Sequence, residues 1–284
     1  PSSGNATLAI LGLYQRARPT PGGAENADDW SAFLWASRLA YADRDHYMAD
    51  DRFVQAPTKE LIAPAYLDER AKLIDLTKGP VAIPVGTPAG DALRSRWGSE
   101  AMQEHGTTHL SVVDHDGNAV SLTATVESEY GSHRMAGGFW LNNQLTDFSL
   151  APTIDGKPVA NAVAPLKAPR SSMSPSVITD KDGRLVMVAG SMGGSTIIAS
   201  VSRTIIGVLD WKQTPQEAVG AAAVFARTPD IFVEGSRMPQ EMSAALRGLG
   251  WRITEDAAYS GTHVIQVTPR GLVGGADPRA EGKA

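Results

Sequence analysis

Residues 107–126 read TTHLSVVDHDGNAVSLTATV, two runs of alternating side chains on either side of a turn-forming Asp116-Gly117 pair. Alternation with a period of two predicts β-strands, and a short turn containing glycine predicts that they form an antiparallel hairpin. A pairing that is wrong by one residue would move every side chain to the opposite face. The hairpin therefore has one self-consistent register, and it fixes a piece of β-structure in the middle of the chain.

The length of the loop decides that register. A two-residue turn would mix apolar and hydroxyl side chains on both faces of the hairpin. A three-residue loop, residues 115–117 with a left-handed glycine, instead sets Leu110 opposite Leu122 and makes one face uniformly apolar, so we expect this register. The other face becomes a row of small hydroxyls, with Thr107 across from Thr125 and within reach of a hydrogen bond.

Thr107 has a possible chemical role at the start of this row. A threonine hydroxyl is a poor nucleophile unless a base takes its proton, and one solution uses the α-amine of the same residue. That amine exists only at a chain terminus, so the role requires cleavage between Gly106 and Thr107. Because β-branched residues are common in strands for structural reasons, the hairpin alone does not establish this chemistry.

A second motif, GRLVMVAGSMGGSTIIASVSRTIIGVL at residues 183–209, predicts a strand, a Gly-rich turn and an apolar helix capped by Ser195. Gly193 and Gly194 precede the helix, where free backbone N–H groups could form an oxyanion hole. The turn is not a phosphate loop, because it lacks the lysine that such loops place after the second glycine.

Two polar clusters lie between these motifs. Residues 137–149 gather amides and a carboxylate, including Gln144 and Asp147, and Ser171 and Ser172 lie in a proline-bounded stretch. A carboxylate suits an ammonium group and paired hydroxyls suit a carboxylate. The clusters therefore favour a zwitterionic ligand.

Composition excludes several classes of protein. The 284 residues include no cysteine, which rules out disulfides, thiolate zinc sites and a cysteine nucleophile. The net charge of −5 without a basic run gives no reason to expect nucleic acid as a partner, and no apolar run is long enough to span a bilayer. The six histidines show no ligand spacing, so we expect neither a metal nor an organic cofactor.

The chain divides near residue 107. Helices are predicted for residues 5–17, 30–48 and 64–74, the second of them amphipathic, followed by a Pro/Gly-rich linker at residues 77–91. After residue 107 the pattern predicts strands and further helices. The predicted ranges are 109–114, 119–126, 176–179, 184–189 and 263–268 for strands, and 195–211, 215–223 and 239–248 for helices.

Together these segments resemble the γ-glutamyltranspeptidases, which belong to the N-terminal-nucleophile hydrolase class. The resemblance runs nearly end to end and rests on PSSG, RLAYADRDHYMADDRFV, TTHLSVVDHDGNAVSLTATVES, LNNQLTDFS, RSSMSP, GSMGGS and ADPRAEG. It implies an α+β fold, a four-layer αββα sandwich. Residues 1–106 would be the C-terminal part of a large subunit, and residues 107–284 the small catalytic subunit.

The resemblance also implies roles for individual residues. Thr107 would be the nucleophile, released by self-cleavage after Gly106, and the hydroxyl row of the hairpin would be a wall of the active site. The other implied site residues are Thr125 as its activating partner, Gly193 and Gly194 as oxyanion donors, Glu127, Gln144 and Asp147 at the substrate α-amine, and Ser171 and Ser172 at the α-carboxylate.

This sequence departs from the family pattern near the ammonium site. Thr146 replaces an aspartate of the family motif, whereas Glu127 stands where some members have asparagine, so one carboxylate is lost and one is gained. The family's large subunit is much longer and includes an arginine for the α-carboxylate. We therefore expect the rest of that subunit as a partner of this chain.

The implied activity is hydrolysis or transfer of the γ-glutamyl group of glutathione-like amides to water, amino acids or peptides. A glutaryl-cephalosporin acylase on the same fold is an alternative, although glutaryl lacks the amine that Asp147 and Glu127 would bind. A second alternative is an inactive binding or scaffold relative, against which the retained Thr107 and Thr125 argue. The resemblance implies a periplasmic or extracellular location and leaves the cytoplasm open.

Overall fold

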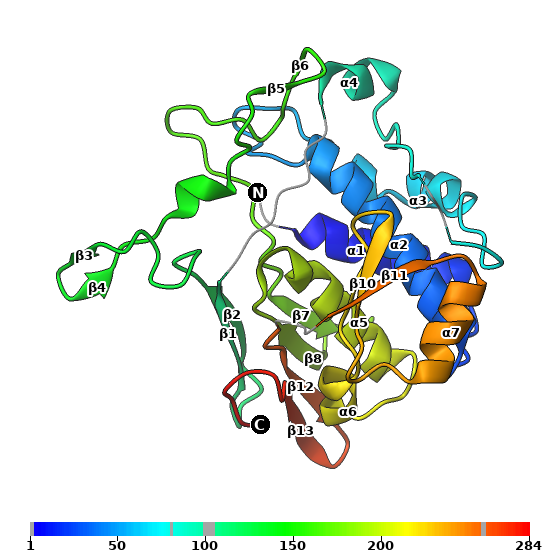
Figure 1. Ribbon diagram of the computed structural model, residues 1–284. Helices are drawn as coiled ribbons and strands as arrows, with labels where there is room; N and C mark the ends of the chain where they lie inside the picture. The colour runs from blue at the N-terminus through cyan, green and yellow to red at the C-terminus, as the bar shows by residue number, and fades with distance from the viewer. Residues whose placement is uncertain (1–2, 80–81, 99–105, 257–259) are drawn as a thin grey trace.

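The computed structural model describes residues 3–79, 82–98, 106–256 and 260–284, drawn in Figure 1. Its helices are α1 (Gly4–Ala17), α2 (Ala27–Tyr47), η1 (Glu60–Ile62), α3 (Pro64–Ala71), α4 (Asp91–Arg96), η2 (Gln144–Asp147), η3 (Gly194–Thr196), α5 (Ile197–Leu209), α6 (Pro215–Gly220) and α7 (Gln240–Gly248), of which η1, η2 and η3 are 3₁₀ turns. Its strands are β1 (Thr108–Val113), β2 (Ala119–Ala124), β3 (Met135–Ala136), β4 (Phe139–Trp140), β5 (Thr153–Ile154), β6 (Lys157–Pro158), β7 (Ser176–Thr179), β8 (Leu185–Gly190), β9 (Val224–Phe225), β10 (Asp230–Glu234), β11 (Arg252–Asp256), β12 (His263–Thr268) and β13 (Gly271–Ala276).

Two sheets are stacked in the part of the chain after residue 106. The β1–β2 hairpin packs against β7, β8 and β12 of a four-stranded sheet with the order β13-β12-β8-β7, and α5 and α6 pack against the same larger sheet (Figure 1). Helix α1 contacts both α5 and α2. The α+β class and the stacked sheets are confirmed. In the part of the chain that the structure describes, helices cover one side of the pair, next to the larger sheet.

The register of the hairpin is the predicted one. Leu110 pairs with Leu122 and Thr108 with Ala124, which leaves Thr107 next to the end of the ladder. Gly117 has φ +84°, a left-handed conformation that glycine adopts without a steric penalty, as the three-residue loop requires. The loop length therefore selected the register, as the sequence indicated.

The two faces of the hairpin have unexpected surroundings. The apolar face points to solvent, and four of its side chains are 46–50% exposed: Leu110, Val112, Val120 and Leu122. The hydroxyl face packs inward, where Ser121 Oγ donates to the carbonyl of Ala189 on β8 at 3.0 Å. The prediction that the hydroxyl row is a wall of the active site is therefore wrong for its middle. Ser111 and Ser121 join the two sheets, because each hydroxyl donates to a backbone carbonyl of the facing sheet.

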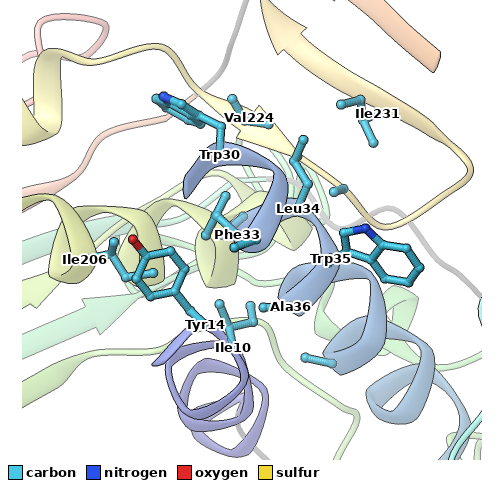
Figure 2. Packing of buried hydrophobic residues seen from close by; sticks show 14 of the residues in the cluster. Ile10, Tyr14, Trp30, Phe33, Leu34, Trp35, Ala36, Ile206, Val224 and Ile231 are labelled. Carbon is cyan, nitrogen blue, oxygen red and sulfur yellow. The ribbon is translucent and has the colours of Figure 1, made fainter. Parts of the chain in front are cut away.

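Helix α2 is central and not amphipathic, which corrects the predicted pattern. Every residue from Asp29 to Tyr41 is buried. Figure 2 shows Trp30, Phe33 and Leu34 of this helix among side chains of α1, α5, β9 and β10. A helix enclosed on all sides needs apolar or small residues all round, and its polar groups need partners. The alternation of small and large residues in WSAFLWASRLAY serves such packing.

Most predicted boundaries hold within two or three residues. Strands β7 and β12 match their predicted ranges, and α5 begins after the 3₁₀ turn η3 with Thr196 as its N-cap, so the predicted cap at Ser195 is wrong by one residue. Part of the linker at residues 77–91 lies outside the described residues, and α4 begins at its end. In the described ranges, no helix combines the length and the apolar composition that crossing a bilayer demands.

A histidine lies in the interface between the two sheets. The ring of His109 contacts Thr123 Oγ1 at 2.8 Å and Ser111 Oγ at 3.0 Å, and it stacks on His263. A Cβ on Gly190 would lie 2.1 Å from this ring, so only glycine lets the sheets come this close. Burial, together with the neighbouring His263, lowers the pKa of His109 to about 4.

We expect His109 to make the folded protein sensitive to mild acid. Between pH 6.5 and 4 the unfolded chain binds a proton at this histidine that the folded chain does not, so stability falls as the pH falls. The loss between pH 8 and 5 is about 2 kcal/mol. Urea unfolding at both pH values should show a flatter response for His109→Gln than for the wild type. His115→Gln, at an exposed loop histidine, should keep the wild-type slope.

Candidate active site

One small cavity gathers eight of the predicted site residues from distant parts of the chain. The residues come from the start of β1, the end of β2, the turn η2, the stretch 168–175 and the turn η3. The cavity is lined by Thr107, Thr125, Glu127, Gln144, Asp147, Ser171, Ser172 and Gly194, together with Met173 and Ile197. The fold thus brings together the two threonines at the end of the hydroxyl row, two carboxylates and two serines. In the sequence these residues lie up to 65 positions apart, from Thr107 to Ser172.

The backbone is strained where the predicted cleavage would occur. Thr107 has φ +99°, in a region that β-branched residues strongly disfavour, and Gly106 has φ +82°. A Cβ on Gly106 would lie 1.5 Å from the carbonyl oxygen of Glu127, so the position accepts only glycine. Strain of this kind costs about 1–3 kcal/mol and persists where the surrounding structure enforces it.

The Gly-rich turn faces the same peptide bond. The N–H of Gly193 donates to the carbonyl oxygen of Gly106 at 3.4 Å. Gly193 and Gly194 both have positive φ, +125° and +58°, which glycine adopts without a steric penalty. One of the two predicted oxyanion donors, the N–H of Gly193, therefore lies at the carbonyl that the hydroxyl of Thr107 would attack, and Gly194 lines the cavity.

Thr125 uses its hydroxyl oxygen as an acceptor. The backbone N–H of Glu127 donates to Thr125 Oγ1 at 2.8 Å. Among the described residues, the hydrogen bond between the hydroxyls of Thr107 and Thr125 that the register would permit is not made. The proton of Thr125 remains available for a group inside the cavity, because the oxygen already accepts elsewhere.

Two buried carboxylates line the cavity. Glu127 and Asp147 are each 5% exposed. Glu127 accepts hydrogen bonds from Ser128, at 2.6 Å, and from the side chain of Asn143, while Asp147 accepts one from Gln144. Buried carboxylates need donors or a cation, so this pair of carboxylates suits an ammonium group. In the described ranges, no three His, Asp or Glu side chains gather as metal ligands would.

Two serines line the same cavity. Ser171 Oγ accepts from the backbone N–H of Met173 at 3.2 Å, and Ser172 Oγ accepts from the guanidinium of Arg44 at 2.7 Å. A hydroxyl that already accepts a hydrogen bond keeps its own proton for donation. Both serines can therefore donate to an anion in the cavity.

Comparison with known proteins agrees with this arrangement. The family model for gamma-glutamyltranspeptidase matches residues 1–284, the whole of the chain. The chain belongs to the γ-glutamyltranspeptidase family. It is 36% identical over 292 residues to the glutathione hydrolase proenzyme of Escherichia coli strain K12, a match that covers 99% of this chain and 48% of the relative. Another member, an acylase proenzyme of Pseudomonas sp. strain V22, is 31% identical, with 87% of this chain and 41% of the relative covered.

Solved structures give the same result. The γ-glutamyltranspeptidase of Helicobacter pylori is 35% identical with a TM-score of 0.55, over 61% of this chain and 100% of that one. A cephalosporin acylase from Bacillus halodurans has a TM-score of 0.82 over 100% of this chain and 49% of that one, at 23% identity, and shows the fold. The chain spans about half the length of the curated relatives that it matches.

Some residues at the family's site were not predicted from the sequence. Arg44 and Ser3, both from the part of the chain before residue 107, contact the serine pair. The side chain of Asn143 donates a hydrogen bond to Glu127. The two aspartates and the arginine of YADRDHY carried a signal, because charged residues in a helix that is otherwise apolar need buried partners. The prediction of an amphipathic helix did not use this signal.

Proposed function

We propose that this protein hydrolyses and transfers γ-glutamyl groups, with Thr107 as the nucleophile after the bond between Gly106 and Thr107 is cut. The observation that carries the proposal is one cavity whose lining includes a threonine, two buried carboxylates and two serines that can donate hydrogen bonds. A γ-glutamyl group has an ammonium and a carboxylate on one carbon, which suit the carboxylates and the serines, and its γ-carbonyl is the group that the threonine would attack. The family membership supports the same activity.

The same hydroxyl would act twice. In the precursor, Thr107 Oγ1 attacks the carbonyl carbon of Gly106, the N–H groups of Gly193 and Gly194 stabilise the negative oxygen, and the resulting ester is hydrolysed by water. The new α-amine of Thr107 then serves as the base. It takes the hydroxyl proton while the oxygen attacks the γ-carbonyl of the substrate, and it gives the proton to the departing amine. Water or an acceptor amine finally cleaves the γ-glutamyl ester.

The substrates and partners follow from the same proposal. The donor would be glutathione or a similar γ-glutamyl amide, and the acceptor water, an amino acid or a peptide. After cleavage, residues 107–284 would remain bound to the preceding segment and to the rest of a larger subunit. The periplasmic or extracellular location that the resemblance implied stays a prediction.

A cephalosporin acylase is the second candidate, since an acylase proenzyme and a cephalosporin acylase structure are among the relatives. A glutaryl group keeps the carboxylate but lacks the ammonium. A glutaryl group would give Glu127 and Asp147 no cation, so that substrate would forgo a charged hydrogen bond worth about 1.5–3 kcal/mol. The two buried carboxylates therefore favour the γ-glutamyl substrate.

Steady-state kinetics of the full-length protein tests the choice. We expect kcat/KM on γ-glutamyl-p-nitroanilide to exceed that on glutaryl-7-aminocephalosporanic acid by at least about tenfold, because one charged hydrogen bond is worth about 1.5–3 kcal/mol. A preference for the glutaryl substrate would assign the protein to the acylases. Absence of turnover on both, with the chain uncut, would favour the inactive relative.

A further inference from the structure

Arg44 connects helix α2 to both serines of the cavity. Its side chain is 1% exposed, and its guanidinium donates to Ser172 Oγ at 2.7 Å and to Ser3 Oγ at 2.9 Å. Ser3 Oγ in turn donates to the backbone carbonyl of Ser171. One buried cation from the part of the chain before the predicted cleavage point thus contacts the serine pair directly and through a single intermediate.

The direction of these hydrogen bonds determines what the serine can do. A guanidinium has donors and no acceptor, so the oxygen of Ser172 must accept from Arg44. The single hydroxyl proton is then left for another acceptor, and Ser172 lines the cavity. A cation at the oxygen also polarises the O–H bond and makes it a better donor to an anion.

Arg44 belongs to a buried ion-pair cluster. Asp45 pairs with three arginines: Arg227 at 2.7 Å, Arg44 at 3.2 Å and Arg170 at 3.7 Å. Burial raises the pKa of Asp45, but these three guanidinium groups outweigh burial and keep it below its usual range. The ion pair with Asp45 therefore helps to fix the guanidinium of Arg44 beside Ser172.

We infer that Arg44 is a positioning residue that fixes Ser172 as a hydrogen-bond donor to the substrate α-carboxylate. The inference rests on the proposed γ-glutamyl activity and adds a residue outside the cavity lining to it. Arg44 does not touch the substrate. It acts by setting the direction of the Ser172 hydroxyl and, through Ser3, the backbone of Ser171.

Three p-nitroanilide substrates distinguish a positioning role at the α-carboxylate from a general structural role. In full-length Arg44→Met protein, KM should rise about 10–100-fold for γ-glutamyl-p-nitroanilide and glutaryl-p-nitroanilide, which both have the carboxylate. It should rise less than about threefold for 4-aminobutyryl-p-nitroanilide, which keeps the ammonium and lacks the carboxylate. kcat should change little for all three. On a Ser172→Ala background, Arg44→Met should add less than about threefold, since both changes remove the same donor.

Arg203→Met is the matched control. Arg203 is also buried, on α5, where it donates to the carbonyl of Ala218, and it does not line the cavity. It should lower thermal stability and leave the ratios among the three amides as in the wild type. If Arg44→Met does not assemble, Arg44→Lys carries the test, because it keeps the charge and loses the forked geometry. In Arg44→Lys, KM should rise about 3–10-fold for the two amides that have the carboxylate, and it should rise least for 4-aminobutyryl-p-nitroanilide.

The outcomes are distinct. Wild-type protein without activity on γ-glutamyl-p-nitroanilide overturns the proposed function, and this inference with it. Active wild type, with Arg44 variants that affect the three amides equally, overturns the inference alone and makes Arg44 a structural residue.

Discussion

Replacing Thr107 by alanine should leave a single uncut chain without amidase activity. The variant loses the hydroxyl that would attack the Gly106 carbonyl, and an uncut chain has no α-amine at residue 107 to act as base. Wild-type protein should instead give a fragment that begins Thr-Thr-His-Leu at residue 107. Mass spectrometry of the purified protein detects this fragment, and hydrolysis of γ-glutamyl-p-nitroanilide measures the activity.

Serine at the same position provides the control. Thr107→Ser keeps the hydroxyl and, after cleavage, the amine, so both cleavage and hydrolysis should persist at altered rates. It also removes the β-branch that makes φ +99° unfavourable, so cleavage is the step more sensitive to this change. Wild-type protein that hydrolyses γ-glutamyl amides while the bond between residues 106 and 107 is intact would refute the mechanism.

Replacing Asp147 by alanine should remove a partner of the substrate ammonium. The expected loss in kcat/KM on γ-glutamyl-p-nitroanilide is about 10–150-fold, which corresponds to the 1.5–3 kcal/mol of a charged hydrogen bond. Activity on glutaryl-p-nitroanilide should fall less than about threefold, because that substrate has no ammonium to bind. Initial rates on the two amides give the comparison.

Two variants separate binding from structure at this position. Asp182→Ala removes a carboxylate from an exposed turn and should leave both amides unaffected. Asp147→Asn keeps an acceptor for Gln144 but not the charge, so it should behave like alanine on the γ-glutamyl amide if charge is what matters. Equal losses on both amides would show that Asp147 supports the turn η2 and does not bind substrate.

The fold was predictable wherever local pattern and loop geometry determine it. The hairpin register followed from the alternation of side chains and from Gly117, and both are local features. The surroundings of the hairpin were not predictable, because they depend on which elements pack against each face. Leu110 and Leu122 looked like core residues and are about half exposed, whereas Ser121 is satisfied by the backbone of β8. The range of helix α2 was predicted within three residues, but its amphipathic character was wrong for the same reason.

The candidate site was predictable where each residue carries its chemistry in its own short motif. Thr107, Asp147 and the serine pair could be placed at one site only through the family resemblance, and the structure puts them around one cavity. Arg44 could not be found in this way. Its role depends on a contact with Ser172, which lies 128 positions away in the sequence. The local sequence around Arg44 is equally compatible with a solvent-exposed helix face.

The strain at Thr107 has a consequence for the direction of self-cleavage. The dihedral angle φ is defined by the carbonyl carbon of the preceding residue, so it exists at Thr107 only while Gly106 is attached. Cutting the bond abolishes the unfavourable angle, and rejoining the pieces would have to restore it. About 1–3 kcal/mol of strain corresponds to an equilibrium shifted about 5- to 150-fold towards the cut form. In the proposed self-cleavage, the strain at Thr107 therefore favours the cut form and opposes rejoining of the two pieces.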